Sequence, residues 1–167
     1  CQESALEKLL NGGLNTDGRL SEDVIREIWK VPSDDYFLRH TPRQVAEMTY
    51  LMCNHDPQAG PLVVLHERKG QGSDEGATEI SVYVADRQHL FAATVAALNR
   101  LGLSVHDASI HTSAEGLCLN TFIVLDEHGK APGKRPSDRE ALQTQLTAIL
   151  SATGRLPSVP KRRLPRQ

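Results

Sequence analysis

The fold is decided by residues 79–126, which read EISVYVADRQHLFAATVAALNRLGLSVHDASIHTSAEGLCLNTFIVLD. The first six residues alternate between polar and apolar side chains, and a period of two residues is typical of a strand with one buried face. We therefore predict a half-buried strand whose two faces divide as follows: Ile80, Val82 and Val84 on one face, and Glu79, Ser81 and Tyr83 on the other.

A helix is predicted to follow this strand, because apolar residues recur at the helical period between Leu90 and Leu101. Asp86 is placed to cap the start of the helix. Gly102 follows its last apolar residue, which is where a helix commonly ends.

A hairpin and a second helix complete the pattern. Two strand-like runs, residues 103–112 and 117–125, flank a short polar segment that predicts a turn. Ser137 and Glu140 then form a capping-box sequence ahead of an apolar stripe, and Gly154 closes that helix. The predicted order is therefore strand, helix, strand, strand, helix.

This order is α+β and lacks only one strand of a ferredoxin-like sandwich. The tail after Gly154 is a poor candidate for that strand, because its three prolines remove backbone donors. Residues 62–68 read as a strand and run into the next one through a polar loop, residues 70–78. We predict that residues 62–68 take the fourth-strand position, antiparallel to residues 80–84.

Short helices are predicted to precede the sheet. Residues 4–11 and 21–30 have helical apolar patterns, and Ser21 is a candidate cap for the second. Thr41 and Gln44 make a capping box with a proline between them, so a third helix is predicted to run from there to about residue 54. Three aromatic side chains lie in or beside the segment between the second and third helices: Trp29, Tyr36 and Phe37.

Composition limits the kind of protein. Of the 167 residues, 39% are hydrophobic and 24% charged, which is typical of a globular chain, and no apolar run is long enough to span a membrane. The net charge of −2 gives no electrostatic basis for nucleic-acid binding. Three widely spaced cysteines, Cys1, Cys53 and Cys118, form neither a disulfide framework nor a zinc pattern, so we expect a reducing, cytoplasmic setting. The chain does not begin with Met, and we expect it to be excised from a longer protein.

No catalytic set is recognisable in the chain. The pairs His55-Asp56 and His106-Asp107 both spell the dipeptide of metal-dependent phosphohydrolases. Such a site needs further His and Asp ligands on helices, whereas His55 stands at a helix end and His106 on a predicted strand. We therefore expect no metal site and no cofactor in this chain.

Several of these segments together resemble a known family. The run from Asp86 through Arg87, Leu90, Phe91 and Ala92 resembles the first turn of an ACT domain, and residues 103–112 and 120–125 resemble its second and third strands. The sequence DYFLRHTP at residues 35–42, taken with residues 106–108 and 121–125, is similar to the bifunctional uridylyltransferase/uridylyl-removing enzymes, which modify the nitrogen regulatory protein PII. This resemblance runs from about Trp29 to the C-terminus.

The resemblance implies a domain layout. Residues 1–58 would be a helical extension or linker from a preceding HD-type hydrolase domain, residues 59–154 an ACT domain, and residues 155–167 a basic, proline-rich linker to a second ACT domain. The catalytic domains, expected to use Mg²⁺, and PII as their substrate would lie outside this chain. Tyr36, Phe37 and His40 would either dock onto those domains or pack the linker against the sheet.

The resemblance also implies a function. In the family, the ACT region senses glutamine and sets the balance between uridylylation and its reversal. The ligand site would comprise residues in the first turn and at the second strand: Asp86, Arg87, Gln88, His89, Leu90 and Asp107. Ligand-binding ACT domains usually carry Pro-Gly where this chain has Gln88-His89. The alternative is therefore a docking or dimerisation module without a small ligand, with residues 104–112 as the exposed edge of a homodimer.

Overall fold

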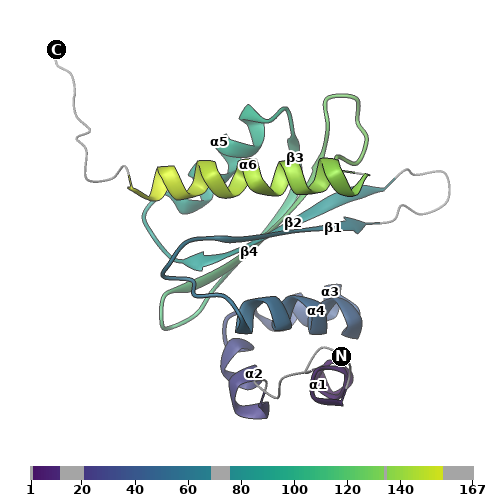
Figure 1. The fold of residues 1–167 in the computed structure, drawn as a ribbon, viewed down its shortest axis with the longest axis vertical. Coiled ribbons are helices and arrows are strands. Elements are labelled where there is room, and N and C mark those ends of the chain that lie inside the picture. Colours follow the sequence, from purple (N-terminus) through teal and green to yellow (C-terminus); the bar gives the residue numbers. More distant parts are fainter. Residues whose placement is uncertain (1, 12–20, 69–75, 134, 156–167) are drawn as a thin grey trace. The chain divides into compact units, whose positions relative to one another are not determined.

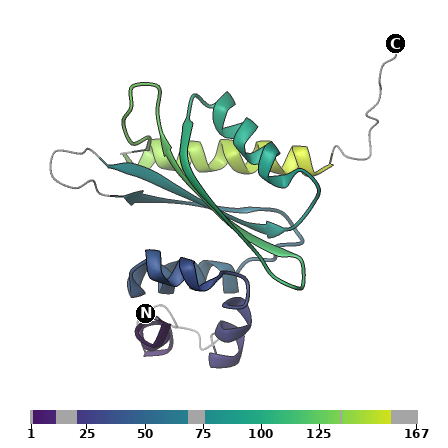
Figure 2. The ribbon, with the colours of Figure 1, turned by 180° about the vertical axis from the view of Figure 1, so that it is seen from behind.

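The sheet and its helices follow the predicted order in the structure of the protein, a computed structural model that describes residues 2–11, 21–68, 76–133 and 135–155. Figure 1 shows the elements, and Figure 2 shows them from behind. In the described residues they are α1 (Gln2–Asn11), α2 (Glu22–Ile28), α3 (Asp34–Arg39), α4 (Pro42–Cys53), β1 (Leu62–Arg68), β2 (Ala77–Ala85), α5 (Leu90–Arg100), β3 (Ser104–Thr112), β4 (Leu117–Leu125) and α6 (Pro136–Arg155).

The four strands form one antiparallel sheet in the order β1-β2-β4-β3. This is the strand order of a ferredoxin-like sandwich in which β1 occupies the fourth-strand position beside β2. The α+β prediction and the predicted role of residues 62–68 are therefore confirmed. The basic tail, residues 156–167, and most of the predicted loop, residues 69–75, lie outside the described residues.

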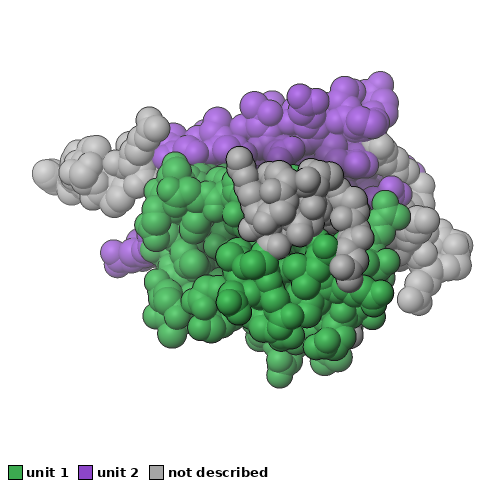
Figure 3. All heavy atoms as spheres, turned by 60° about the horizontal axis from the view of Figure 1, so that its bottom comes forward, with its two compact units in different colours: residues 1–62, 82–86, 110–119 green, residues 63–81, 87–109, 120–167 purple. Residues whose placement is uncertain are grey.

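The chain divides into two compact units, which Figure 3 colours separately. The first comprises residues 1–62, 82–86 and 110–119, and therefore joins the four N-terminal helices to the end of β2 and to the β3–β4 turn. The second comprises residues 63–81, 87–109 and 120–167, and therefore contains α5, α6 and the rest of the sheet.

In the first unit, α4 packs against both α1 and α2. Ser21 caps α2 by accepting a hydrogen bond from the Val24 backbone N–H, and Thr41 and Gln44 form the predicted capping box on α4. The indole N–H of Trp29 donates to the Thr49 hydroxyl at 2.8 Å, and that hydroxyl donates to the Val45 carbonyl. The helices thus bury the following side chains: Ala5, Leu9, Ile25, Val45, Met48 and Met52.

Helix α3 was not predicted, since its sequence mixes acidic and aromatic residues without a clear period. It forms because Asp34 and Asp35 stand at its N-terminus, where negative charge is favourable, and Asp35 pairs with Arg39 one turn later at 3.2 Å. Tyr36 and Phe37 are buried, which agrees with the prediction that they pack the linker.

In the second unit, α5 packs against α6. Their contact side chains share the core with residues from β2 and β4: Leu98, Leu146, Leu150, Ile80 and Phe122 are all fully buried. The Gln143 amide reaches from α6 to the Val63 carbonyl of β1 at 2.6 Å, which ties the N-terminal strand to the C-terminal helix. Phe91 of α5 is 39% exposed and stacks on Phe122.

The prediction that β2 is half-buried is wrong, because residues 78–84 are buried on both faces. On the face predicted to be polar, the Tyr83 ring packs edge-on against His55, and the Ala85 N–H donates to the Pro57 carbonyl. Glu79 is buried as well, and its carboxylate pairs with Arg68 on β1 at 3.2 Å. The alternating pattern thus came from polar residues that are buried inside the protein.

Two helix boundaries also differ from prediction. Helix α6 begins at Pro136, so Ser137 lies inside its first turn and is not the cap. A proline is favoured at the first helical position because its missing N–H would have no partner there. The same helix continues to Arg155, one residue beyond the predicted stop at Gly154. In α2, Val24 is 42% exposed, whereas the neighbouring Ile25 is fully buried.

The Trp29–Thr49 hydrogen bond gives a stability prediction. Replacing Thr49 with Val keeps the side-chain shape but leaves a buried indole N–H without an acceptor, which typically costs about 1–3 kcal/mol. We expect Thr49→Val to lower the free energy of urea unfolding by that amount. Thr147→Val is the matched control, because the Thr147 hydroxyl also donates one turn back along its helix but is only half-buried. Equal losses in the two variants would contradict this role for Thr49.

Candidate ligand-binding site

The turn between β2 and α5 carries most of the predicted site residues, and its backbone is unusual. His89 has φ 63° and ψ 18°, which is the left-handed region, and in the described residues no other non-glycine residue has a positive φ. Side chains with a Cβ atom adopt this region at a cost, whereas glycine adopts it freely. The turn therefore keeps a glycine-like backbone at the position where ligand-binding ACT domains usually carry glycine.

The prediction that Asp86 caps α5 is wrong. The N-cap of α5 is His89, whose side chain makes no capping hydrogen bond, and the helix begins at Leu90. Asp86 lies too far upstream to reach the first-turn amides, because a capping residue must directly precede the helix. Its backbone N–H donates to the Gly116 carbonyl at 2.7 Å, and its carboxylate lies beside the Cys118 thiol.

The other predicted residues of the turn have distinct environments. The Arg87 guanidinium donates to the Leu150 carbonyl near the end of α6 at 3.1 Å, and burial lowers the pKa of Arg87. Leu90 is a core residue, only 4% exposed, whereas Gln88 and His89 are exposed. A ligand at this turn would therefore meet the Gln88 and His89 side chains directly, while Arg87 and Leu90 hold the turn in place.

Asp107 stands apart from the turn in sequence and lies midway along the edge strand β3. It is exposed, and its carboxylate accepts a hydrogen bond from the Ala108 backbone N–H at 3.0 Å. The prediction that it belongs to the same ligand site stays a prediction.

Cys118 and Thr112 lie beside Asp86 and were not predicted to belong to this region. The Cys118 thiol is buried and lies 3.4 Å from the Thr112 hydroxyl across the β3–β4 hairpin. Burial raises the pKa of Cys118, and the Asp86 carboxylate raises it further. The thiol is therefore held protonated and is unsuited to nucleophilic chemistry. The predicted hairpin brings Thr112 and Cys118 together, but no local sequence signal could have placed Asp86 beside them.

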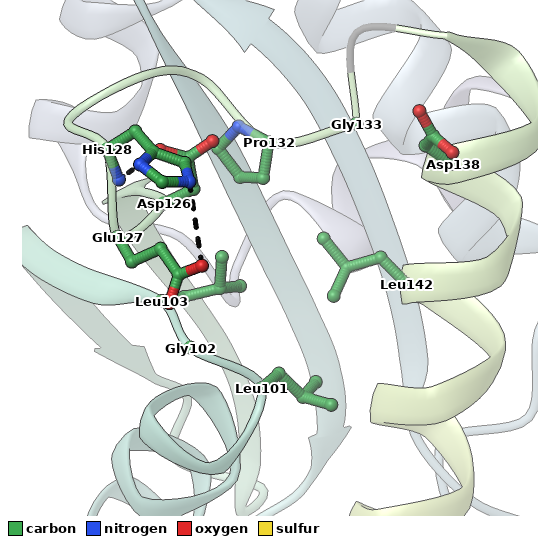
Figure 4. A pocket seen from close by; sticks show the side chains of 10 residues that line it. All are labelled: Leu101, Gly102, Leu103, Asp126, Glu127, His128, Pro132, Gly133, Asp138 and Leu142. Atoms are coloured by element: carbon green, nitrogen blue, oxygen red, sulfur yellow. Dashed lines mark hydrogen bonds and ion pairs between the residues drawn. The ribbon is translucent and has the colours of Figure 1, made fainter.

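A pocket of about 300 Å³ lies elsewhere in the second unit, where α5 ends and α6 begins (Figure 4). Its walls combine leucines with acidic residues from the loop before α6: Leu101, Gly102, Leu103, Asp126, Glu127, His128, Pro132, Gly133, Asp138 and Leu142. This pocket was not predicted, because its walls come from three separate segments of the chain.

The Asp126 and Asp138 carboxylates of the pocket already have hydrogen-bond or ion-pair partners in the surrounding loop. Asp126 accepts hydrogen bonds from the backbone N–H groups of His128 and Lys130, at 2.8 and 2.9 Å, which lower its pKa. Asp138 pairs with Arg135 at 2.8 Å. Negative charge along this rim disfavours the carboxylate of an amino acid, so the pocket is a poor alternative to the turn at residues 86–90.

The two dipeptides considered as metal sites have other partners. The imidazole of His55 makes a hydrogen bond with the Gly60 carbonyl at 2.8 Å, and that of His106 contacts the Ser104 hydroxyl at 3.2 Å. Across the part of the chain that the structure describes, no three His, Cys, Asp or Glu side chains are grouped to hold a metal ion. Within those same ranges, no helix has the length and apolar character that crossing a membrane requires.

Comparison with known proteins finds similar sequences along almost the whole chain. Residues 1–49 match the model of the family described as "Uridylyltransferase GlnD fifth domain". The bifunctional uridylyltransferase/uridylyl-removing enzymes of Ectopseudomonas mendocina and Azotobacter vinelandii are each 37% identical to this chain over 166 residues, or 99% of its length. Over almost its whole length, the chain is thus similar to one segment of these enzymes. The enzyme of Pseudomonas savastanoi pv. phaseolicola shows the same identity and coverage.

The match covers only part of these relatives. The chain spans 18% of the length of the uridylyltransferase/uridylyl-removing enzymes that it matches. The similarity also reaches further toward the N-terminus than predicted, since it includes the helices before Trp29. No solved structure matches the chain.

The left-handed turn gives a prediction for His89. Glycine at this position relieves a backbone cost of about 1–2 kcal/mol but adds freedom to the unfolded chain, so His89→Gly should stabilise the protein by about 0.5–1 kcal/mol in urea unfolding. Gln88→Gly, in the adjacent exposed residue without a positive φ, is the control and should destabilise it. A loss of stability in His89→Gly equal to that in Gln88→Gly would show that the turn does not favour glycine.

Proposed function

We propose that this chain is a regulatory region of a PII uridylyltransferase/uridylyl-removing enzyme, which senses glutamine or passes that signal to the catalytic domains. The observation that carries the proposal is the 37% identity with such enzymes across 99% of the chain. The same proposal includes the activity of the whole enzyme, its Mg²⁺ and its substrate PII. It also includes a second ACT domain and a cytoplasmic location.

The geometry of the turn supports a ligand at residues 86–90. The left-handed conformation at His89 keeps the glycine-like path into α5, and α5 has no side chain capping its first turn. Backbone N–H groups at a helix N-terminus favour a carboxylate, which every amino acid carries. The His89 imidazole is exposed and would lie at the edge of such a ligand rather than beneath it.

An alternative function has its own support. In the described residues β3 is an edge strand that pairs only with β4, and Ile110 on it is 55% exposed. The opposite edge, β1, has its Val63 carbonyl occupied by Gln143 of α6. An exposed strand edge can pair with a second strand, so the chain could serve as a docking or dimerisation module through β3 without binding a small molecule.

The sensing proposal is tested by thermal unfolding of the 167-residue chain with millimolar glutamine, and with glutamate and glycine as controls. A ligand at about 100 times its Kd adds about 2.7 kcal/mol, which raises the Tm by several degrees for a domain of this size. We expect a shift specific to glutamine that is lost in Gln88→Trp and kept in Gln145→Trp, a matched change at an exposed position of α6. No shift in the unmodified chain would favour the docking function instead.

The docking alternative predicts a dimer in size-exclusion chromatography with light scattering. Ile110→Lys should convert it to a monomer, because a charge on the edge strand opposes strand pairing. Leu38→Lys is the matched control, since Leu38 is 85% exposed but lies on α3 and not on the strand edge. A monomer at every concentration of the unmodified chain would contradict this alternative.

A further inference from the structure

His111 stands out among the histidines because it is buried against the helical segment of the first unit. It lies near the end of β3 and is only 6% exposed. Its Nδ1 atom is 3.3 Å from the Ser33 backbone nitrogen and 2.9 Å from the Ser33 hydroxyl oxygen. The Tyr36 ring packs edge-on against the imidazole, with the centroids 6.0 Å apart. A single side chain thus joins the edge strand to residues 33–40, which comprise α3 and its two caps.

These contacts define the protonation state of His111. A backbone N–H can only donate, so Nδ1 must be the acceptor and the ring must be neutral, with its proton on Nε2. Ser33 is the N-cap of α3 and makes no side-chain capping bond; its hydroxyl lies beside His111 instead. In effect, the imidazole anchors the N-terminus of α3.

The charged and titratable groups that act on His111 come from the same helical segment. Burial lowers the pKa of His111 below its usual value of 6.5, the Asp35 carboxylate raises it, and His40 and Arg39 lower it. Because the folded protein favours the neutral ring, the contact is complete above the ordinary pKa. It weakens as the pH falls from that value through the lowered pKa of the folded state.

We propose that His111 is an acid-released latch, which holds residues 33–40 on the β3–β4 hairpin while its ring is neutral and lets them go when Nδ1 is protonated. The added proton turns the acceptor into a donor that faces the Ser33 N–H. The Ser33 hydroxyl can rotate to accept from the charged ring, but the backbone N–H has lost its acceptor and the charge remains buried. The latch does not depend on the proposed sensing of glutamine.

His40 provides an internal contrast. Its Nδ1 lies 2.7 Å from the Tyr36 carbonyl oxygen, so this nitrogen is the donor. Protonation leaves that donor in place, and the hydrogen bond survives at low pH. The His40–Tyr36 hydrogen bond thus differs from the His111–Ser33 contact, in which the added proton removes the acceptor.

Release would open the aromatic cluster beneath α3. Phe37 packs edge-on against Trp29 at 5.6 Å and against Tyr36 at 5.5 Å. Tyr36 and Phe37 belong to the released segment, so the hydrophobic surface of Trp29 would become accessible with them. The latch therefore controls whether the first unit presents an apolar, aromatic surface.

Amide hydrogen exchange by NMR on the 167-residue chain tests the latch between about pH 7.5 and about pH 5, across the titration range of histidine. Protection factors, which correct for the intrinsic pH dependence of exchange, should fall several-fold at Ser33 and Tyr36 as the pH drops. The amide of Leu98, in α5 of the second unit, should keep its protection. Nitrogen chemical shifts of the His111 ring should report a neutral ring with the proton on Nε2 at pH 7.5.

Two variants separate the latch from a general loss of stability. His111→Asn places an amide oxygen where Nδ1 accepts, so it should keep protection at Ser33 at pH 7.5 and abolish the fall at low pH. His106→Asn changes an exposed histidine on the same strand and should leave the fall unchanged. If His111→Asn does not fold, the test is made in the unmodified chain alone: protonation of the His111 ring, followed by its nitrogen chemical shifts, should coincide with the loss of protection at Ser33. Two results would overturn the proposal. One is a loss of Ser33 protection at low pH that persists in folded His111→Asn; the other is a His111 ring that is already charged at pH 7.5.

Discussion

The pairing of β1 with β2 is the contact on which the sheet depends. A ferredoxin-like sheet needs a strand on the outer side of its first central strand, and here that strand comes from the N-terminal side of the chain. Without β1, the fully buried Ile80 and Val82 would lie on an open edge, and Glu79 would lose its partner Arg68. Burying a carboxylate without a partner is costly, so strand order and charge pairing support one another. The Gln143 amide then attaches this strand to α6.

The first unit is held together by polar contacts placed inside an apolar cluster. Trp29 and His111 both present ring nitrogens to buried surroundings, and each finds its partner on another segment: Thr49 for the indole and Ser33 for the imidazole. Buried polar groups are tolerated only when they are paired. The pairs therefore determine where the short helices can sit, which apolar packing alone would leave less well defined.

The turn at residues 86–89 shows how a glycine-like backbone can form without a glycine. His89 adopts the left-handed backbone that glycine would adopt, while Arg87 and Leu90 attach the turn to α6 and to the core. The conformation is thus imposed by the neighbouring residues rather than chosen by His89. A residue in this strained region is often found where a site requires a particular backbone path.

Local signals in the sequence were sufficient for every described element except α3, and for their order. The capping box at Thr41, the helical stripe of α5 and the turn glycines each depend on neighbours in the chain, and each was found where predicted. The poor strand character of the proline-rich tail also pointed to β1 as the missing strand. The turn before α5 was also predicted as a segment, but the capping role of Asp86 was wrong, and the ligand role of residues 86–90 stays a prediction.

Tertiary structure decided the features that join distant segments. The alternation in β2 could not show that both faces are buried, because the residues that cover Tyr83 and Ala85 come from another part of the chain. Helix α3 and the buried state of His111 depend on each other across nearly half the sequence. Periodicity and capping report on interactions within a few residues, whereas burial, pKa and partner choice depend on which segments meet in three dimensions.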